Sequence, residues 1–225
     1  MPVRRSLLAD PVLDVAPKLL GMVLRSTSDE GTVAVRLTEV EAYDGPNDPG
    51  SHAYRGQTPR NAVMFGPAGF LYVYFTYGMH FCMNVSAGPD GQPSAVLLRA
   101  GEIVEGIELA RVRRGPLETH QVKFNQSGVR PGPVVKRPKV NPDRDLARGP
   151  ARLCVALGIG RDHNGVDLLA KGSTVQLLPG PGFDGEPSTG PRVGLREAAD
   201  RNWRFWIPGD PTVSPYRPHV PKRRA

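Results

Sequence analysis

Cysteine, metal-ligand clusters and long apolar stretches are all scarce in this sequence. Its two cysteines, Cys82 and Cys154, are too few for a disulfide scaffold, and their apolar neighbours predict small buried thiols. The five histidines are scattered, and no pair has the spacing of metal ligands on a helix, so no metal site built by the protein is expected. The longest stretch without acidic or basic residues, 61–89, is interrupted by glycine, proline and polar residues and is not typical of a membrane span.

Glycine and proline are abundant instead. The chain of 225 residues has 26 glycines and 24 prolines, more than a fifth of its length, where roughly 12% is usual. This excess argues against a helical bundle or a coiled coil. No apolar stretch of signal-peptide length follows Arg4 and Arg5. We therefore expect a cytoplasmic protein, associated with the nucleoid if its source is bacterial, with no membrane partner.

Short apolar or alternating runs predict many strands and few helices. Strands are predicted over residues 22–26, 32–43, 71–76, 79–86, 95–99, 167–178, 192–195 and 204–207. Helices are predicted over residues 14–20, 103–113 and 150–157. Tyr77 and Gly78 can turn the chain between two of the strands, which predicts a protruding β-hairpin. The expected fold is one α+β domain over residues 1–225, in which helices and long loops flank a curved antiparallel sheet.

The net charge of +7 is concentrated in two segments. Residues 111–152 contain eleven basic and three acidic residues, and 111–145 is expected to be a basic, proline-rich loop. Residues 216–225 are a basic tail. The remainder is slightly acidic, and this pattern suits a polyanionic partner such as nucleic acid. A solvated loop and a solubilising tail would explain the same charges.

Two glutamates lie on one predicted strand at an interval that places both on the same face. Glu39 and Glu41 would be roughly 6.5–7 Å apart, a spacing open to an acid/base pair or to two exposed strand residues. Arg99 ends the apolar run 95–98, and a charge at the end of a buried strand needs a partner. A carboxylate such as Glu41 could pair with it, although a surface arginine is the simpler interpretation of Arg99 alone.

Tyrosines cluster in the predicted hairpin. Alternation in residues 71–76 places Leu71, Val73 and Phe75 on a core face and two tyrosines on the opposite face. Tyr77 falls at the tip, where small or polar residues suit a turn better. An aromatic tip can insert between stacked bases, or a neighbouring loop can cover it.

Together these stretches resemble the alkyladenine (3-methyladenine) DNA glycosylase family, the methylpurine glycosylases. The resemblance covers about residues 19–209, in family order. It is carried by the strings TEVEAYDGPNDPGSH, QTPRN, MFGPAGFLYVYFTYGMHFCMNVS, AVLLRA, GPARLC and PRVG.

The resemblance implies a role for each matching residue. Glu41 matches the catalytic glutamate that activates a water to attack C1′ of a flipped nucleotide. Arg99 and the backbone of Val193 match groups that hold this water. Tyr77 matches the residue inserted into the duplex where the base has left.

A second set implied by the resemblance forms the pocket for the base. Tyr43, His52 and Tyr74 match the side chains that sandwich the flipped base. Asn84 matches the asparagine that disfavours guanine by crowding its 2-amino group, and Leu97 matches a residue that lines the pocket.

The implied activity is a monofunctional DNA-3-methyladenine glycosylase. It would excise alkylated purines, such as 3-methyladenine and 7-methylguanine, from double-stranded DNA and leave an abasic site, with hypoxanthine left open as a substrate. We expect a monomer that needs no metal or organic cofactor. One alternative is a catalytically silent nucleic-acid binding module. Another is a carbohydrate-active hydrolase that uses Glu39 and Glu41, although such a pair would have to flank the sugar from opposite sides.

Overall fold

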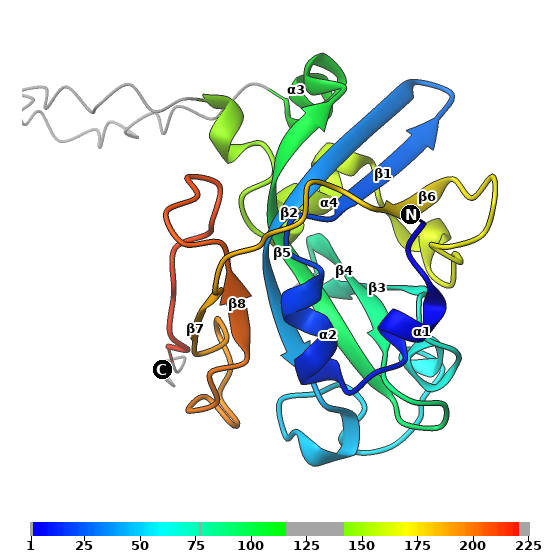
Figure 1. Ribbon diagram of the computed structural model, residues 1–225, viewed down its shortest axis with the longest axis vertical. Coiled ribbons are helices and arrows are strands. Elements are labelled where there is room, and N and C mark those ends of the chain that lie inside the picture. Colours follow the sequence, from blue (N-terminus) through cyan, green and yellow to red (C-terminus); the bar gives the residue numbers. More distant parts are fainter. Residues whose placement is uncertain (1, 77, 116–141, 221–225) are drawn as a thin grey trace, which may run out of the picture.

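The computed structural model describes residues 2–76, 78–115 and 142–220. They form a single α+β domain built on a curled antiparallel sheet of eight strands (Figure 1). The strands are β1 (Val23–Ser28), β2 (Gly31–Tyr43), β3 (Leu71–Thr76), β4 (His80–Ala87), β5 (Ser94–Glu105), β6 (Val175–Leu178), β7 (Ser188–Gly190) and β8 (Arg204–Trp206). The predicted fold class is confirmed.

The two longest strands form the centre of the sheet. The order is β3-β4-β5-β2-β1-β6, and β8 pairs with β2 on one edge and β7 on the other. The second half of β2 therefore lies between β5 and β8: Glu41 is opposite Leu97 on one side and Arg204 on the other. Two register irregularities flank Glu39 in this stretch. Such bulges bend a strand and redirect its side chains.

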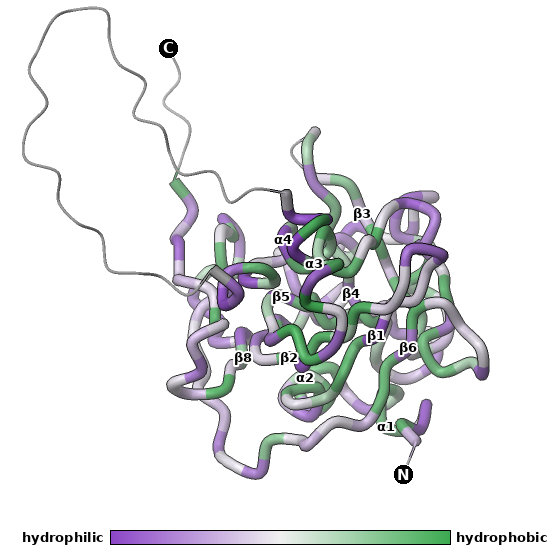
Figure 2. The backbone as a smooth tube through the Cα atoms, turned by 90° about the horizontal axis from the view of Figure 1, so that it is seen from above, coloured by the Kyte–Doolittle hydropathy of each residue, from purple (hydrophilic) through white to green (hydrophobic). Residues whose placement is uncertain are grey.

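Four short α-helices and four 3-10 turns complete the described part of the domain. The helices are α1 (Arg5–Leu8), α2 (Val12–Lys18), α3 (Ile107–Arg114) and α4 (Pro150–Leu157). The 3-10 turns are η1 (Gly45–Asn47), η2 (Ala62–Phe65), η3 (Pro142–Asp145) and η4 (Arg161–His163). Helices α2 and α4 pack on the central strands, and their apolar residues form one core with the inward residues of the sheet. Residues of high hydropathy gather around these packed elements, and hydrophilic residues are frequent along the outer loops (Figure 2). No helix in the described ranges is long and apolar enough to cross a membrane.

Several boundaries differ from the prediction. Residues 103–105 belong to β5 because they continue its pairing with β2, and Gly106, with a φ of 73°, then begins α3. In the predicted strand 167–178 only β6 is a strand, and residues 192–195 form none. Helix α2 begins at Val12 and ends at Lys18, two residues earlier at each end than predicted. Strand β7 was missed.

The ends of the predicted basic loop are helical. Arg111–Arg114 complete α3, and Pro142–Asp145 form η3. The stretch between them, 116–141, lies outside the described residues, as do the last five residues of the tail.

Strands β3 and β4 pair antiparallel as predicted for the hairpin, and Tyr77 at its tip lies outside the described residues. Leu71 and Val73 reach the core, but Phe75 does not. It is 42% exposed and packs against Phe81 across the hairpin, with ring centroids 5.1 Å apart. The hairpin has left the body of the domain by this point, so alternation no longer predicts burial.

Candidate active site

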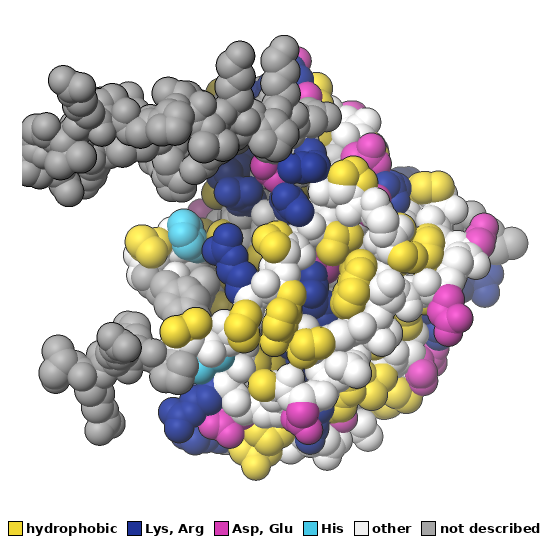
Figure 3. Space-filling view, turned by 90° about the vertical axis from the view of Figure 1, so that its left-hand side faces the viewer, with side chains coloured by type: hydrophobic (Ala, Val, Ile, Leu, Met, Phe, Trp, Pro, Cys, Tyr) yellow, Lys and Arg dark blue, Asp and Glu magenta, His cyan; other side chains and the backbone are white. Residues whose placement is uncertain are grey.

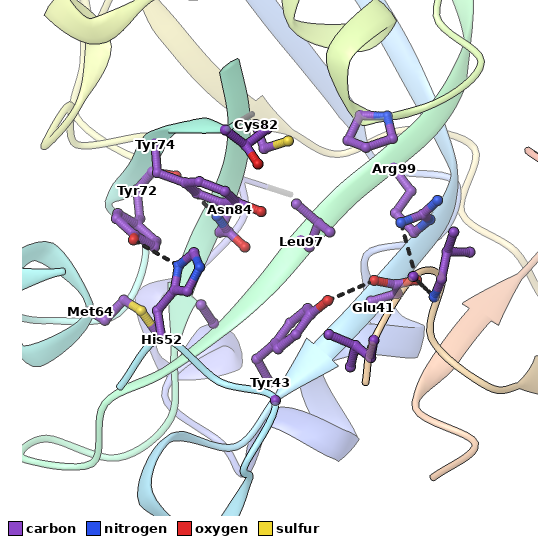
Figure 4. A pocket seen from close by; sticks show the side chains of 17 residues that line it. Glu41, Tyr43, His52, Met64, Tyr72, Tyr74, Cys82, Asn84, Leu97 and Arg99 are labelled. Atoms are coloured by element: carbon purple, nitrogen blue, oxygen red, sulfur yellow. Dashed lines mark hydrogen bonds and ion pairs between the residues drawn. The ribbon is translucent and has the colours of Figure 1, made fainter. Parts of the chain in front are cut away.

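A cavity of about 410 Å³ opens between the hairpin, the ends of β2 and β5, and two loops. One loop contributes Gly50 and His52, and the other contributes residues 193–195. Eight of the predicted site residues line the cavity: Glu41, Tyr43, His52, Tyr74, Asn84, Leu97, Arg99 and Val193. The ninth, Tyr77, lies outside the described residues. Residues separated by more than 150 positions in the chain thus meet in one pocket (Figure 4).

Glu41 is a buried carboxylate at one end of this pocket. The backbone N–H of Val193 donates to its Oε1 over 2.7 Å, and the Tyr43 hydroxyl donates to its Oε2 over 2.9 Å. A terminal nitrogen of Arg99 lies 3.1 Å from Oε1. Of the two interpretations left open for Arg99, the structure shows the pairing with Glu41 and not a surface arginine. Two hydrogen-bond donors and one cation thus contact a carboxylate that has no exposed surface, and partners of this kind offset the cost of burying it.

The Tyr43 hydroxyl is held in its protonated form. Burial and the neighbouring Glu41 raise the pKa of Tyr43 well above its usual value. The hydroxyl is therefore protonated near neutral pH and donates to Glu41. The tyrosine ring, in contrast, faces across the pocket toward His52 and Tyr74 (Figure 4).

Removing this hydroxyl is expected to slow catalysis without unfolding the protein. In Tyr43→Phe the ring remains, but Glu41 loses one of its donors, and a hydrogen bond to a charged group contributes about 1.5–3 kcal/mol. We expect a loss of about 10-fold or more in the single-turnover base release that the family resemblance implies, with an unchanged far-UV circular dichroism spectrum. A rate equal to that of the wild type would show that the hydroxyl does not support Glu41.

Three aromatic rings form the wall opposite Tyr43. The rings of Tyr72 and Tyr74 stack with centroids 5.6 Å apart, and His52 meets Tyr74 edge-on at 4.6 Å. The His52 Nδ1 lies 3.0 Å from the Tyr72 hydroxyl. Burial, with a smaller effect of Arg60, lowers the pKa of His52 to about 4. The wall is therefore uncharged near neutral pH.

Asn84 and Leu97 form the floor between these walls. They are paired across β4 and β5. Asn84 is nearly fully buried, and its side-chain nitrogen donates to the Tyr72 carbonyl over 3.2 Å. This bond fixes the orientation of the amide toward whatever enters the pocket.

A buried ion pair that the sequence did not predict supports the Val193 loop. Arg192 is fully buried and forms a bidentate salt bridge with Asp48. It also donates to the Ala42 carbonyl over 2.9 Å. Its guanidinium lies 4.6 Å from the centre of the Tyr43 ring and 5.1 Å from Trp203. Arg192 thus anchors both the loop that carries the Val193 N–H and the ring that carries the Tyr43 hydroxyl. The matching string PRVG contains it, but only its contacts show this role.

Tyr72 is one of the two tyrosines that alternation places opposite the core face of its strand, and the sequence assigns it no function. In the structure it contributes to the pocket wall. Cys82 also lines the pocket. Both cysteines are free and buried, as predicted.

Glu39 has no part in the pocket surface. Its carboxylate is bound by Arg99, Arg204 and Ser214 and has no exposed surface. The carbohydrate-hydrolase alternative needs Glu39 and Glu41 to flank a sugar from opposite sides, and it is wrong because Glu39 does not line the pocket. Within the described residues, no three His, Cys, Asp or Glu side chains gather as the ligands of a metal ion would.

The similarity of this chain to known proteins agrees with an antiparallel sheet that holds a buried glutamate beside an aromatic pocket. Residues 6–211 match the family model described as methylpurine-DNA glycosylase. The chain belongs to the methylpurine-DNA glycosylase family and is accordingly a DNA glycosylase, a DNA-binding hydrolase of base excision repair.

Relatives of nearly the same length support this assignment. A protein of Streptomyces avermitilis is 52% identical over 99% of this chain and 95% of its own length. A protein of Leifsonia xyli subsp. xyli is 52% identical over 92% of this chain and 89% of its own, and one of Nocardia farcinica is 48% identical over 94% and 89%. All three carry the name "Putative 3-methyladenine DNA glycosylase".

Proposed function

We propose that this glycosylase excises N-alkylated purines, 3-methyladenine and 7-methylguanine among them, from double-stranded DNA. The nucleotide is flipped into the pocket, a water activated by Glu41 attacks C1′, and the free base leaves. The product is an abasic site in an uncut strand, because the attacking group is water and, among the residues that the structure describes, no lysine lines the pocket to act as an amine nucleophile.

The observation that carries the proposal is the position of Glu41. Its carboxylate lies at one end of a pocket that is lined mainly by aromatic rings and other uncharged groups, with Arg99 beside it. Cleavage of an N-glycosidic bond passes through an oxocarbenium-like state, and a carboxylate at that point both stabilises positive charge and accepts a proton from water. A module that only bound DNA would gain nothing from a buried anion facing the phosphates.

The aromatic walls support selectivity for alkylated purines. N-alkylation gives the purine a positive charge, and a cation over an aromatic ring gains roughly 0.5–2 kcal/mol. Tyr43 on one side and His52 with Tyr74 on the other would enclose such a base. Asn84 would crowd the 2-amino group of unmodified guanine. The electron-rich rings favour the cation only while His52 is neutral.

A pH prediction follows from this neutral histidine. With a pKa of about 4, His52 takes up no proton between about pH 8 and pH 6. We expect the ratio of the excision rates of wild type and His52→Gln on 7-methylguanine to stay constant over that range. A wild-type rate that falls near pH 6.5 while the variant's rate does not would contradict the assignment. The same pKa difference makes stability depend on pH. In the unfolded chain His52 takes up a proton at a higher pH than in the folded protein, so the free energy of unfolding falls as the pH drops from about 6.5 toward about 4.

A base stacked in a duplex cannot reach this pocket, so flipping must precede cleavage. We propose that the hairpin lies against the DNA at the flipped nucleotide and that Tyr77 fills the gap. Phe75 and Met79, which flank the tip, are exposed apolar side chains, as an inserting tip requires.

Basic side chains on the surface suit a polyanion, and Arg60 is one beside the hairpin, with its guanidinium 5.4 Å from the centre of the Tyr74 ring. In Figure 3, Lys and Arg side chains gather around a group of apolar side chains on one face of the molecule. Basic side chains of this kind bind phosphates without reading sequence. We propose that one copy of the chain binds one duplex as a monomer at the chromosome.

The direct test is product analysis with the wild-type enzyme. Methylated duplex DNA is incubated with the protein, and released bases are identified by mass spectrometry while strand length is followed on a denaturing gel. The proposal predicts free 3-methyladenine and 7-methylguanine and a full-length strand that breaks only after alkali treatment. Binding without base release would favour a silent binding module, and strand cleavage without alkali would contradict hydrolysis by water.

A further inference from the structure

Glu39 is a buried carboxylate that the proposed reaction does not use. It lies two residues before Glu41 on β2, and its oxygens are fully occupied by protein donors. Oε1 accepts from the Nε of Arg99 and the Nε of Arg204, both at 2.7 Å, and from the Ser214 hydroxyl at 2.9 Å. Oε2 accepts from the Ser214 backbone N–H at 2.6 Å. These contacts link the centre of the sheet to the C-terminal segment.

Arg99 spans the distance between the two glutamates. Its Nε contacts Glu39, while one terminal nitrogen lies 3.1 Å from Glu41. Its other terminal nitrogen donates to the Ser214 hydroxyl over 3.3 Å. A guanidinium is planar and rigid, so holding its Nε and one terminal nitrogen fixes where the remaining nitrogen lies. Glu39 and Ser214 together therefore determine how Arg99 meets Glu41.

The charges of the cluster balance. Two glutamates meet two arginines, Arg99 and Arg204, and all four side chains are nearly or fully buried. Burial raises the pKa of Glu39, but Arg99 and Arg204 outweigh it, and the pKa lies below its usual value. Glu39 therefore carries a full charge that competes with Glu41 for Arg99.

The residues that complete the cluster come from the end of the chain. Arg204 begins β8 and also donates to the Ser214 carbonyl over 2.7 Å. Ser214 lies beyond the 6–211 match to the family model. The C-terminal segment thus contributes to the site without touching the pocket.

We propose that Glu39 is a positioning residue, which with Arg204 and Ser214 holds the Arg99 guanidinium so that only one of its nitrogens reaches Glu41. The proposal rests on the proposed function of Glu41. Without the Glu39 charge, the guanidinium can turn and pair with Glu41 through two nitrogens, as arginine and carboxylate prefer. The carboxylate would then be neutralised and drawn away from the water that it must activate.

The test compares Glu39→Gln with wild type and Glu41→Gln in single-turnover excision of 7-methylguanine from duplex DNA. We expect Glu39→Gln to lower the maximal rate about 10- to 100-fold, the size of loss that a small misplacement of catalytic groups causes. The enzyme concentration for half-maximal rate is expected to change by less than about 2-fold. A purely structural role would not separate the two quantities in this way.

Two further variants make the result decisive. Ser214→Ala removes one hydroxyl between Glu39 and Arg99, and it is expected to show a smaller loss of the same kind if Glu39→Gln does not fold. Asp210→Asn is the matched control, because Asp210 pairs with Arg36 of β2 over 2.7 Å in the same C-terminal segment without contacting Arg99. Its maximal rate is expected to equal that of the wild type.

The proposal is overturned if Glu39→Gln and Ser214→Ala both keep the wild-type maximal rate. It is overturned as well if these variants raise only the enzyme concentration for half-maximal rate. It is also overturned if Asp210→Asn slows excision by the same factor. These failures leave the role of Glu41 intact as long as Glu41→Gln is inactive. A wild-type enzyme that releases no base would refute both proposals.

Discussion

Glu41→Gln is expected to lower the single-turnover rate of base release on the order of 1000-fold, while the folded structure and binding to lesion-containing DNA persist. Glutamine keeps the shape of the side chain but carries no charge and accepts no proton. General base catalysis contributes about 100- to 10,000-fold. The loss also includes the stabilisation that the anion gives to the oxocarbenium-like sugar.

The measurement is free-base release under enzyme excess, with the dissociation constant for lesion duplex determined in parallel. A matched control is Glu105→Gln, at the exposed end of β5, which is expected to retain full activity. If Glu41→Gln excises within about 10-fold of wild type, below the range for general base catalysis, Glu41 is not the base. If binding falls as much as the rate, Glu41 contributes to affinity rather than to the chemical step.

Asp48→Ala is expected to reduce the free energy of unfolding by about 3–5 kcal/mol. Asp48 and Arg192 have no exposed side-chain surface. Removing the carboxylate leaves the guanidinium in the interior without its partner, and a buried unpaired charge is among the most destabilising changes in a protein. Urea denaturation followed by intrinsic fluorescence measures this loss directly.

An exposed pair provides the contrast. Lys18 and Asp10 are 3.0 Å apart, but both side chains are nearly half exposed. Asp10→Ala is expected to change the free energy of unfolding by about 1 kcal/mol or less. Similar losses for Asp10→Ala and Asp48→Ala would show that the buried pair does not anchor the loop at Arg192.

The parts of the fold that could be predicted are those that local pattern determines. The alternation in β2 and β3 and the turn residues between β3 and β4 define these strands without knowledge of their partners. The end of β5 could not be predicted, because residues 103–105 have helical spacing and become a strand only by pairing with β2. Phe75 was placed wrongly for a related reason: alternation assigns a face but does not reveal where a hairpin leaves the core.

The pocket residues could be named from the sequence because the family motifs contain them. The residues that hold these pocket residues in place could not be named in this way. Asp48 and Arg192 are 144 positions apart, and Glu39 and Ser214 are 175 apart, so no local pattern connects them. Tyr72 shows the same limit, since alternation placed it beside Tyr74 but only the structure shows both rings in the wall.

The central claim is that the pocket receives a flipped purine and presents its C1′ to Glu41. The most direct measurement is a crystal structure of Glu41→Gln bound to duplex DNA that contains 7-methylguanine. The account predicts the base between Tyr43 and the pair His52–Tyr74, with C1′ facing position 41 and a water between them. A lesion that remains stacked in the duplex, or a base whose C1′ faces away from position 41, would contradict it.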